Sequence, residues 1–222
     1  MHLRFALPVL AVGFLVGTPL HSQAPTASEL AHSLQKRYAT IRDFRADFTH
    51  EVRGGVLRTI STTERGELKV KKPGRLLMTY AAPQKKTFVA DGVRVKQYFA
   101  ADRSGTEGPM PTGEDLSSAI LFLAGQGDLI KDFRARLPTD QPGDEWALEL
   151  TPVTRQDDFA ILMLFVDRRT LALHGMTTVD HQGGTFVFRF TNLRENVRLP
   201  DSDFRFTFPK GTNVIYTGRD QD

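Results

Sequence analysis

Hydrophobic positions recur at two different periods along the chain, and the change of period marks where a helix gives way to strands. Leu30, Leu34, Tyr38 and Ile41 recur every three to four residues, which predicts one amphipathic helix. The segment 26–29 has the spacing of a capping box, with a threonine followed by a glutamate three residues later. We therefore expect the helix to begin there.

From residue 43 onward the period falls to two. Phe44, Ala46 and Phe48 alternate with polar residues, which predicts a half-buried strand over 43–52. Further strands separated by short turns are predicted at 56–65, 66–72, 76–80, 87–90, 93–99, 146–151, 160–167, 172–180, 185–192 and 204–208. Gly54-Gly55, Pro73-Gly74, Asp91-Gly92, Arg168-Arg169 and Gly183-Gly184 supply the turns. Strands that follow one another through such turns favour an antiparallel meander in a single, mainly β domain.

Two stretches interrupt this pattern of strands. Residues 101–113 are rich in glycine and proline and are expected to form a loop. Leu116, Ile120, Leu121 and Leu123 then predict a second helix, and a short helical piece is expected around 129–133.

The N-terminal segment differs in composition from the rest of the chain. Arg4 precedes an apolar run over residues 5–16 that is too short to span a membrane, and small residues lie at positions 22 and 24. This pattern predicts a signal peptide over residues 1–24 and one exported, soluble domain over 25–222. Removing the segment takes away one arginine and no acid, so the formal net charge falls from +3 to +2. Such a balance does not suggest a nucleic-acid partner.

No residue pattern of a catalytic or metal-binding site is visible. The chain has no cysteine, and His32, His50, His174 and His181 form no HExxH pair. A nucleophile elbow and a phosphate-binding loop are also missing from the sequence. We expect no enzyme, no metal and no cofactor, although a hydrolase with an unrecognised site stays open. The acidic pairs Asp157-Asp158 and Asp201 with Asp203 are interpreted as solvated turns.

The sequence has more apolar surface than one face of a sheet needs. Residues 161–166 are apolar on both faces of a strand, and Phe186, Phe188 and Phe190 line one face of another. If the sheet curls, its concave side holds either a packed core or a cavity. Periodicity alone leaves both readings open.

Three motifs resemble the outer-membrane lipoprotein carrier family of the LolA type. Residues 66–75 (GELKVKKPGR) are similar to its central motif, residues 44–49 (FRADFT) to its F-x-A-x-F-x-Q opening strand, and residues 204–214 to its C-terminal segment. The resemblance implies an incomplete antiparallel β-barrel of about ten to eleven strands, closed by an α-helical lid. It also implies a monomeric periplasmic carrier that takes acylated lipoproteins from an inner-membrane ABC-type release complex. The cargo would then pass to an outer-membrane receptor that is itself a lipoprotein.

Pattern and resemblance together suggest two groups of site residues. The expected acyl-chain cavity is lined by Leu34, Tyr38, Phe44, Phe48, Leu68, Val70, Leu76, Met78, Tyr80 and Leu121. The expected handover patch is Lys72, Pro73 and Arg75, although the same run reads equally well as a solvated hairpin turn. The family commonly has arginine at the position of Lys72, and lysine lacks the bidentate guanidinium fork. A related module that carries glycolipids or free lipids, or senses mislocalised lipoproteins, is the alternative function.

Overall fold

The computed structural model describes residues 24–54, 62–110, 127–155 and 159–218, which form one large sheet, an α-helix and a short 3₁₀ helix. The α-helix α1 spans Ala27–Ala39, and the 3₁₀ helix η2 spans Asp201–Phe204. The strands are β1 (Asp43–Arg53), β2 (Thr62–Lys71), β3 (Arg75–Ala82), β4 (Lys86–Asp91), β5 (Arg94–Phe99), β6 (Ser104–Pro109), β7 (Phe133–Arg136), β8 (Glu145–Pro152), β9 (Ile161–Asp167), β10 (Leu173–Val179), β11 (Thr185–Glu195) and β12 (Asn213–Tyr216).

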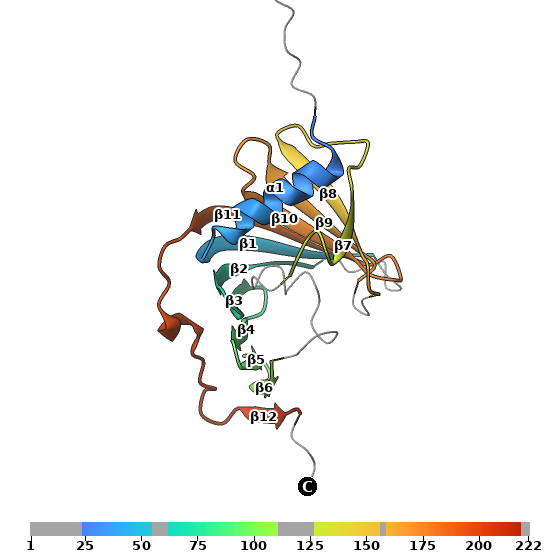
Figure 1. Ribbon diagram of the computed structural model, residues 1–222. Coiled ribbons are helices and arrows are strands. Elements are labelled where there is room, and N and C mark those ends of the chain that lie inside the picture. The colour runs from blue at the N-terminus through green and yellow to red at the C-terminus, as the bar shows by residue number, and fades with distance from the viewer. Residues whose placement is uncertain (1–23, 55–61, 111–126, 156–158, 219–222) are drawn as a thin grey trace, which may run out of the picture.

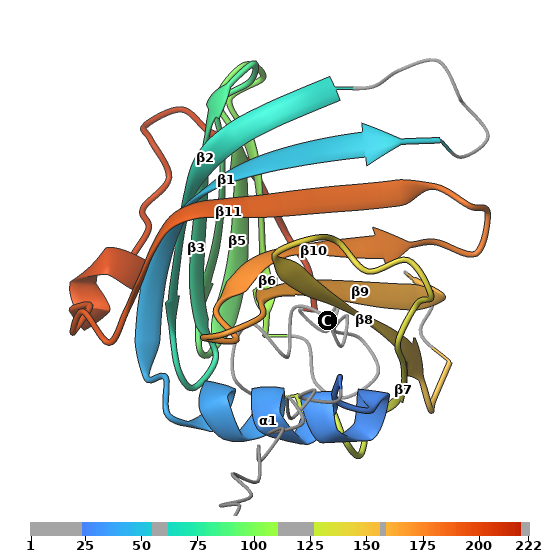
Figure 2. The same ribbon diagram turned by 90° about the horizontal axis from the view of Figure 1, so that it is seen from above.

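The twelve strands form a single open sheet in the order β12-β6-β5-β4-β3-β2-β1-β11-β10-β9-β8-β7. Neighbouring strands are antiparallel, except that β12 runs parallel to β6. Within the described residues β7 and β12 each pair with one strand only, so the sheet does not close on itself. The sheet curves strongly (Figure 1; Figure 2). A mainly β fold with an open, curved sheet agrees with the expected incomplete barrel.

The helix begins where the capping box predicts. The Thr26 hydroxyl accepts a hydrogen bond from the Glu29 amide at 3.2 Å, and the Glu29 carboxylate accepts one from the Thr26 amide at 2.8 Å. These bonds lower the pKa of Glu29 because they stabilise its charged form. Leu30, Ala31 and Leu34 form the buried face of α1. The predicted helix is confirmed.

The period-two pattern places alternate residues of β1 on the inner, concave face of the sheet. Phe44, Ala46 and Phe48 are buried there and lie opposite Val70, Leu68 and Gly66 of β2. A Cβ at Gly66 would lie 2.7 Å from the Phe48 ring, so this position has to remain glycine for the ring to pack against it.

Strand β9 shows why residues 161–166 are apolar throughout. Leu162, Leu164 and Val166 point to the inner face and are at most 1% exposed. The alternate residues Ile161 and Met163 are half-buried on the outer face. The sequence interpretation of a strand with two apolar faces agrees with this placement.

The chain after β11 crosses the outer face of β2–β6, and residues 197–216 are called the C-terminal strap. In both views it leaves β11 and runs outside the green strands (Figure 1; Figure 2), and in Figure 1 it ends as β12 beside β6. Phe204 is 1% exposed. The rings of Phe206 and Phe208 lie 5.8 and 6.4 Å from that of Tyr98 on β5. The strap therefore covers this half of the sheet from behind.

Two acids of the strap are tied to β2. Lys71 Nζ lies 2.6 Å from an Asp201 oxygen, and Lys69 Nζ lies 3.0 Å from an Asp203 oxygen. The pKa of Asp201 is lowered, chiefly by the hydrogen bond from Lys71. The pair lies in a tight turn, and the Asp201 side chain is 52% exposed, but both carboxylates also hold the strap against the sheet, which the sequence interpretation did not include.

Several other elements differ from those expected. The predicted loop over 101–113 contains β6, where Gly105 lets the Phe208 ring approach the strand closely. The helical piece expected at 129–133 is a turn followed by β7, and the strand expected at 204–208 is the end of η2 and an extended part of the strap. The strands expected over 56–65 and 66–72 are a single strand, β2, in the part that the structure describes.

Three predictions fall outside the described residues. They are the signal peptide, apart from its last residue, the second helix with Leu121, and the solvated turn at Asp157-Asp158. Of the helices in the described ranges, none is long and apolar enough to cross a membrane.

Candidate functional site

A cavity of about 290 Å³ lies on the inner face of the sheet. Its volume is near the lower end of the range for small-molecule pockets, and its walls come from β2, β3, β4, β5, β10 and β11. The described lining residues are Leu68, Leu76, Met78, Tyr80, Lys86, Thr87, Phe88, Gln97, Phe99, Met176, Phe188 and Phe190. Most of the wall is apolar, so the cavity suits a flexible hydrophobic ligand.

Four of the predicted cavity residues meet in this wall. Leu68, Leu76, Met78 and Tyr80 come from β2 and β3, where the register sets Leu68 opposite Met78. Phe48 lies beside them, with its ring centroid 4.8 Å from that of Tyr80 and 5.9 Å from that of Phe188. Alternation within β2 and β3, taken together with the family resemblance, had indicated these four residues.

The other described members of the predicted set lie elsewhere. Leu34, Tyr38 and Phe44 line a gap of only about 20 Å³ between α1 and the inner face of β9–β11. Val70 is fully buried in the core and does not line the cavity. The structure therefore places these four residues in packed contacts, because α1 fills the concave side at its own end of the sheet.

The sequence analysis did not identify the parts of the cavity wall that come from β10 and β11 and from β4 and β5. Met176 lies opposite Phe188 in the pairing of β10 with β11, and Phe88 lies opposite Met78 and Gln97 across β3–β5. The alternating Phe186, Phe188 and Phe190 were a signal for one face of a strand. Which strands that face would meet depends on pairing across the sheet, which a pattern within one strand does not give.

A polar cluster borders this apolar wall. The His50 Nδ1 lies 3.0 Å from a Glu64 oxygen, and Lys86 Nζ lies 2.7 Å from the same oxygen. Lys86 also lies 4.2 Å from the centroid of the Tyr80 ring. Burial lowers the pKa of His50, with Glu64 acting in the opposite direction, and burial raises the pKa of the Tyr80 hydroxyl.

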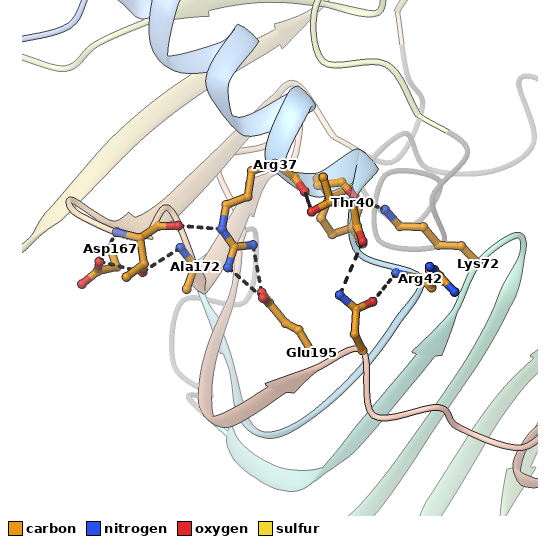
Figure 3. Close-up of polar contacts among 10 residues, drawn as sticks. Arg37, Thr40, Arg42, Lys72, Asp167, Ala172 and Glu195 are labelled. Atoms are coloured by element: carbon orange, nitrogen blue, oxygen red, sulfur yellow. Dashed lines mark hydrogen bonds and ion pairs between the residues drawn. The ribbon is translucent and has the colours of Figure 1, made fainter.

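Lys72 and Arg75 of the predicted handover patch make separate contacts. The Lys72 ammonium donates to the Tyr38 carbonyl at the end of α1 and lies 3.4 Å from the centroid of the Tyr38 ring (Figure 3). Burial lowers the pKa of Lys72 to about 8. Arg75 instead donates to the Asp91 carbonyl at 3.2 Å, with Pro73 in the turn between them. The hairpin is more than a solvated turn, because Lys72 links it to the helix.

The C-terminal end of α1 is also held by Arg37. Its guanidinium forms two hydrogen bonds to Glu195 on β11, at 2.9 and 2.8 Å, and one to the Thr170 carbonyl at 2.6 Å (Figure 3). Asn196 adds bonds to the Arg42 amide at 2.8 Å and to the Thr40 carbonyl at 3.4 Å. The end of the helix is thus fixed to β11 and to the β9–β10 turn.

The histidines do not converge on a common centre. His50 pairs with Glu64 and His174 with Glu145, each at 3.0 Å. Across the ranges that the structure describes, no group of three or more histidine, aspartate or glutamate residues is arranged to hold a metal ion.

Comparisons with known proteins agree on one family. The profile described as "Outer membrane lipoprotein carrier protein LolA" matches residues 39–207. An outer-membrane lipoprotein carrier protein from Cupriavidus taiwanensis is 30% identical over 195 residues, covering 87% of this chain and 90% of the relative. A protein of the same name from Ralstonia nicotianae is 32% identical over 170 residues, covering 74% of this chain and 76% of the relative.

Among solved structures, an uncharacterized conserved protein from Thermus thermophilus has the same overall fold. The TM-score is 0.53 at 13% identity, with 86% of this chain and 98% of the other covered. The family profile spans most of the chain, and the curated relatives match over most of their length. The chain therefore belongs to the outer-membrane lipoprotein carrier family of the LolA type.

Proposed function

We propose that this protein is a periplasmic, non-enzymatic carrier that shelters the acyl chains of lipoproteins in the cavity between β2–β5 and β10–β11. It would take its cargo from an inner-membrane ABC-type release complex and deliver it to an outer-membrane lipoprotein receptor. The observation that carries the proposal is the apolar cavity of about 290 Å³ in a chain whose relatives are named lipoprotein carriers.

The energetics of acyl chains explain why such a cavity is needed. Burying one methylene group is worth roughly 0.8 kcal/mol, so a chain of typical length does not leave a membrane for water at a useful rate. A carrier has to replace the membrane's apolar surroundings and still release the chain. Met78 and Met176 suit this task, because methionine side chains adapt to ligands without a fixed shape.

The handover patch and the lid extend this proposal. Lys72 joins the β2–β3 hairpin to α1 through single-point contacts with Tyr38. An ammonium holds the hairpin to α1 less firmly than a bidentate guanidinium would, so we expect a carrier that releases its cargo readily. Residues 115–123, which lie outside the described ranges, are proposed from their sequence pattern to supply the helical lid with Leu121.

The function is tested by mixing the mature protein with a purified acylated lipoprotein and, separately, with free phospholipid. We expect a soluble one-to-one complex with the lipoprotein, detected by native mass spectrometry. Binding of free lipid alone would favour the alternative, a carrier of other lipids. Binding of neither would mean that the apolar residues on the inner face of the sheet form only a packed core.

Two matched variants locate the binding surface. Met78→Trp fills the cavity and excludes roughly two methylene groups, which should weaken binding about tenfold or more. Met163→Trp places the same ring on the outer face of β9 and should leave binding unchanged. Equal effects of the two variants would contradict a cargo site inside the cavity.

A third variant tests the role of Lys72 in handover. Lys72→Arg offers more donors to the end of α1 and should slow cargo transfer to the receptor. Unchanged cargo affinity and transfer rate would show that Lys72 does not control release.

A further inference from the structure

The polar cluster of His50, Glu64 and Lys86 is an exception in an otherwise apolar surrounding. His50 comes from β1, Glu64 from β2 and Lys86 from β4, and the three side chains meet on the inner face of the sheet. His50 is only 8% exposed. Its ring stacks on that of Phe188, with the centroids 4.1 Å apart and the planes within 3°, and Phe188 lines the cavity.

Only one side of the imidazole is satisfied. Nδ1 lies 3.0 Å from the Glu64 carboxylate, whereas Nε2 is buried and has no hydrogen-bond partner in the described part of the chain. An unpaired buried polar atom costs on the order of 1–3 kcal/mol. His50 is not itself in the cavity wall, but its ring packs on Phe188, which is, so the missing partner of Nε2 can come from a ligand that enters beside Phe188.

The contact with Glu64 decides which kind of partner fits. The Glu64 carboxylate is paired with Lys86 and can only accept hydrogen bonds. The ring proton of His50 therefore lies on Nδ1, which donates a hydrogen bond to Glu64. A neutral imidazole then has a lone pair on Nε2. That atom accepts a hydrogen bond, and its partner must be a donor. An ester-linked acyl chain has no donor, whereas an amide-linked chain carries one N–H beside its acyl carbonyl.

Lys86 complements this acceptor. Lys86 lines the cavity, and its ammonium is paired with Glu64 and lies over the Tyr80 ring. An ammonium has three hydrogens and only donates, so it suits the carbonyl oxygen that amides and esters share. Lys86 would donate to the carbonyl of either kind of ligand. His50 would accept a hydrogen bond only from the amide, because the ester has no N–H.

We propose that the cluster of His50, Glu64 and Lys86 is a subsite that selects amide-linked over ester-linked acyl chains, with His50 Nε2 accepting the amide N–H. The inference rests on the proposed function, because it assumes that the acyl chain enters the cavity. It adds the chemistry of the linkage that this chain prefers.

A pair of probes that differ in one group tests the subsite. N-palmitoylglycine methyl ester has an amide N–H, and its depsi analogue, the palmitoyl ester of methyl glycolate, has an oxygen in that place. Binding to the full mature protein is measured by isothermal titration calorimetry or by displacement of a fluorescent fatty acid. We expect the amide to bind about tenfold more tightly than the ester.

Variants separate the role of Nε2 from that of the packing around it. His50→Phe keeps a ring against Phe188 and removes the acceptor, so the preference for the amide should vanish or reverse. His50→Gln keeps an amide donor and an acceptor and should retain part of the preference. His174→Phe removes a histidine with the same Nδ1 contact to a glutamate but with a side chain that is 40% exposed, and should change nothing.

The outcomes distinguish this inference from the proposed function. Equal binding of both probes to the unmodified protein would overturn the subsite and leave the acyl carrier standing. Failure of both probes to bind would overturn the carrier itself. Loss of the preference in His174→Phe as well would show that the effect does not arise at His50, and would also overturn the subsite.

Discussion

The two halves of the sheet are covered on opposite faces. In the half formed by β7–β11, α1 lies on the concave side and leaves a gap of about 20 Å³. In the half formed by β2–β6, the C-terminal strap lies on the outer face, and the concave side keeps a cavity of about 290 Å³. Each half of the sheet is covered on one face by another segment. A cover on the concave side gives a packed core, and a cover on the outer side leaves the concave side free to form a ligand cavity.

The difference explains how a stable domain tolerates a hollow region. Phe204 of the strap and Val89 of β4 are each nearly fully buried, so the cavity half has a core of its own behind the sheet. The inner face of that half does not have to be filled to hold the strands together. The packed half, with Leu148, Leu162 and Leu164 almost fully buried, carries the ordinary core.

The largest expected effect contrasts one residue from each half. Leu164→Ala removes a side chain that is 1% exposed in the packed half and should lower the free energy of unfolding by about 2–5 kcal/mol. Met78→Ala enlarges an existing cavity and should cost less than half as much. Chemical denaturation of both variants gives the comparison. Equal losses would mean that the cavity half is packed as tightly as the other.

A second change tests the cover on the outer face. A Cβ at Gly105 would meet the Phe208 ring at 2.5 Å and the Gln97 carbonyl at 2.9 Å. Gly105→Ala should therefore displace the strap and destabilise the fold by about 1–3 kcal/mol. Hydrogen exchange should rise in residues 201–216 before it rises in β9. Gly143→Ala is the control, because its Cβ would meet nothing within 4 Å.

The anchor of α1 should contribute a smaller amount to stability. Arg37 and Glu195 are each about a quarter exposed and form a bidentate pair. A double-mutant cycle with Arg37→Met and Glu195→Gln should give a coupling of about 1–2 kcal/mol in the free energy of unfolding. A coupling near zero would mean that packing alone keeps α1 on the concave side.

The smallest effect is a change in the pH dependence of stability. Burial holds the pKa of His50 below its ordinary value of 6.5, so the unfolded chain takes up a proton at a higher pH than the folded protein does. Stability should therefore fall as the pH is lowered below about 6.5, until the pKa of the folded state is passed. In His50→Phe this part of the slope should disappear from thermal melts taken between pH 7 and 5. An unchanged slope would show that His50 is not held neutral by the fold.

Local pattern predicted the elements whose causes are local. The capping box at Thr26 set the start of α1, the alternation from Phe44 gave β1, and the Asp91-Gly92 turn has its glycine at φ +97°. By contrast, β6, β12 and η2 depend on contacts between distant segments, such as the pairing of Val214 with Gly105 and the ion pair of Asp201 with Lys71. Those contacts leave no periodic signal in a glycine-rich stretch.

The candidate site divides in the same way. Leu68 and Met78 were expected from the alternation within their own strands and from the family resemblance together. Met176 and Lys86 line the cavity, and His50 and Glu64 contact Lys86 at its border, through strand pairings that only the folded sheet specifies. For Leu34 and Tyr38, helical spacing identified the inward face of α1. It did not show that this face packs against β9–β11 and lies away from the larger cavity.

The most direct test of the account is photo-crosslinking with a palmitoyl chain that carries a diazirine at its far end, followed by peptide mapping. We predict labels on β3, β4 and β11, at residues such as Met78, Phe88 and Phe188 that line the larger cavity. Labels confined to α1 or to the outer face of β9 would contradict the central claim that the strap-covered half holds the acyl chain.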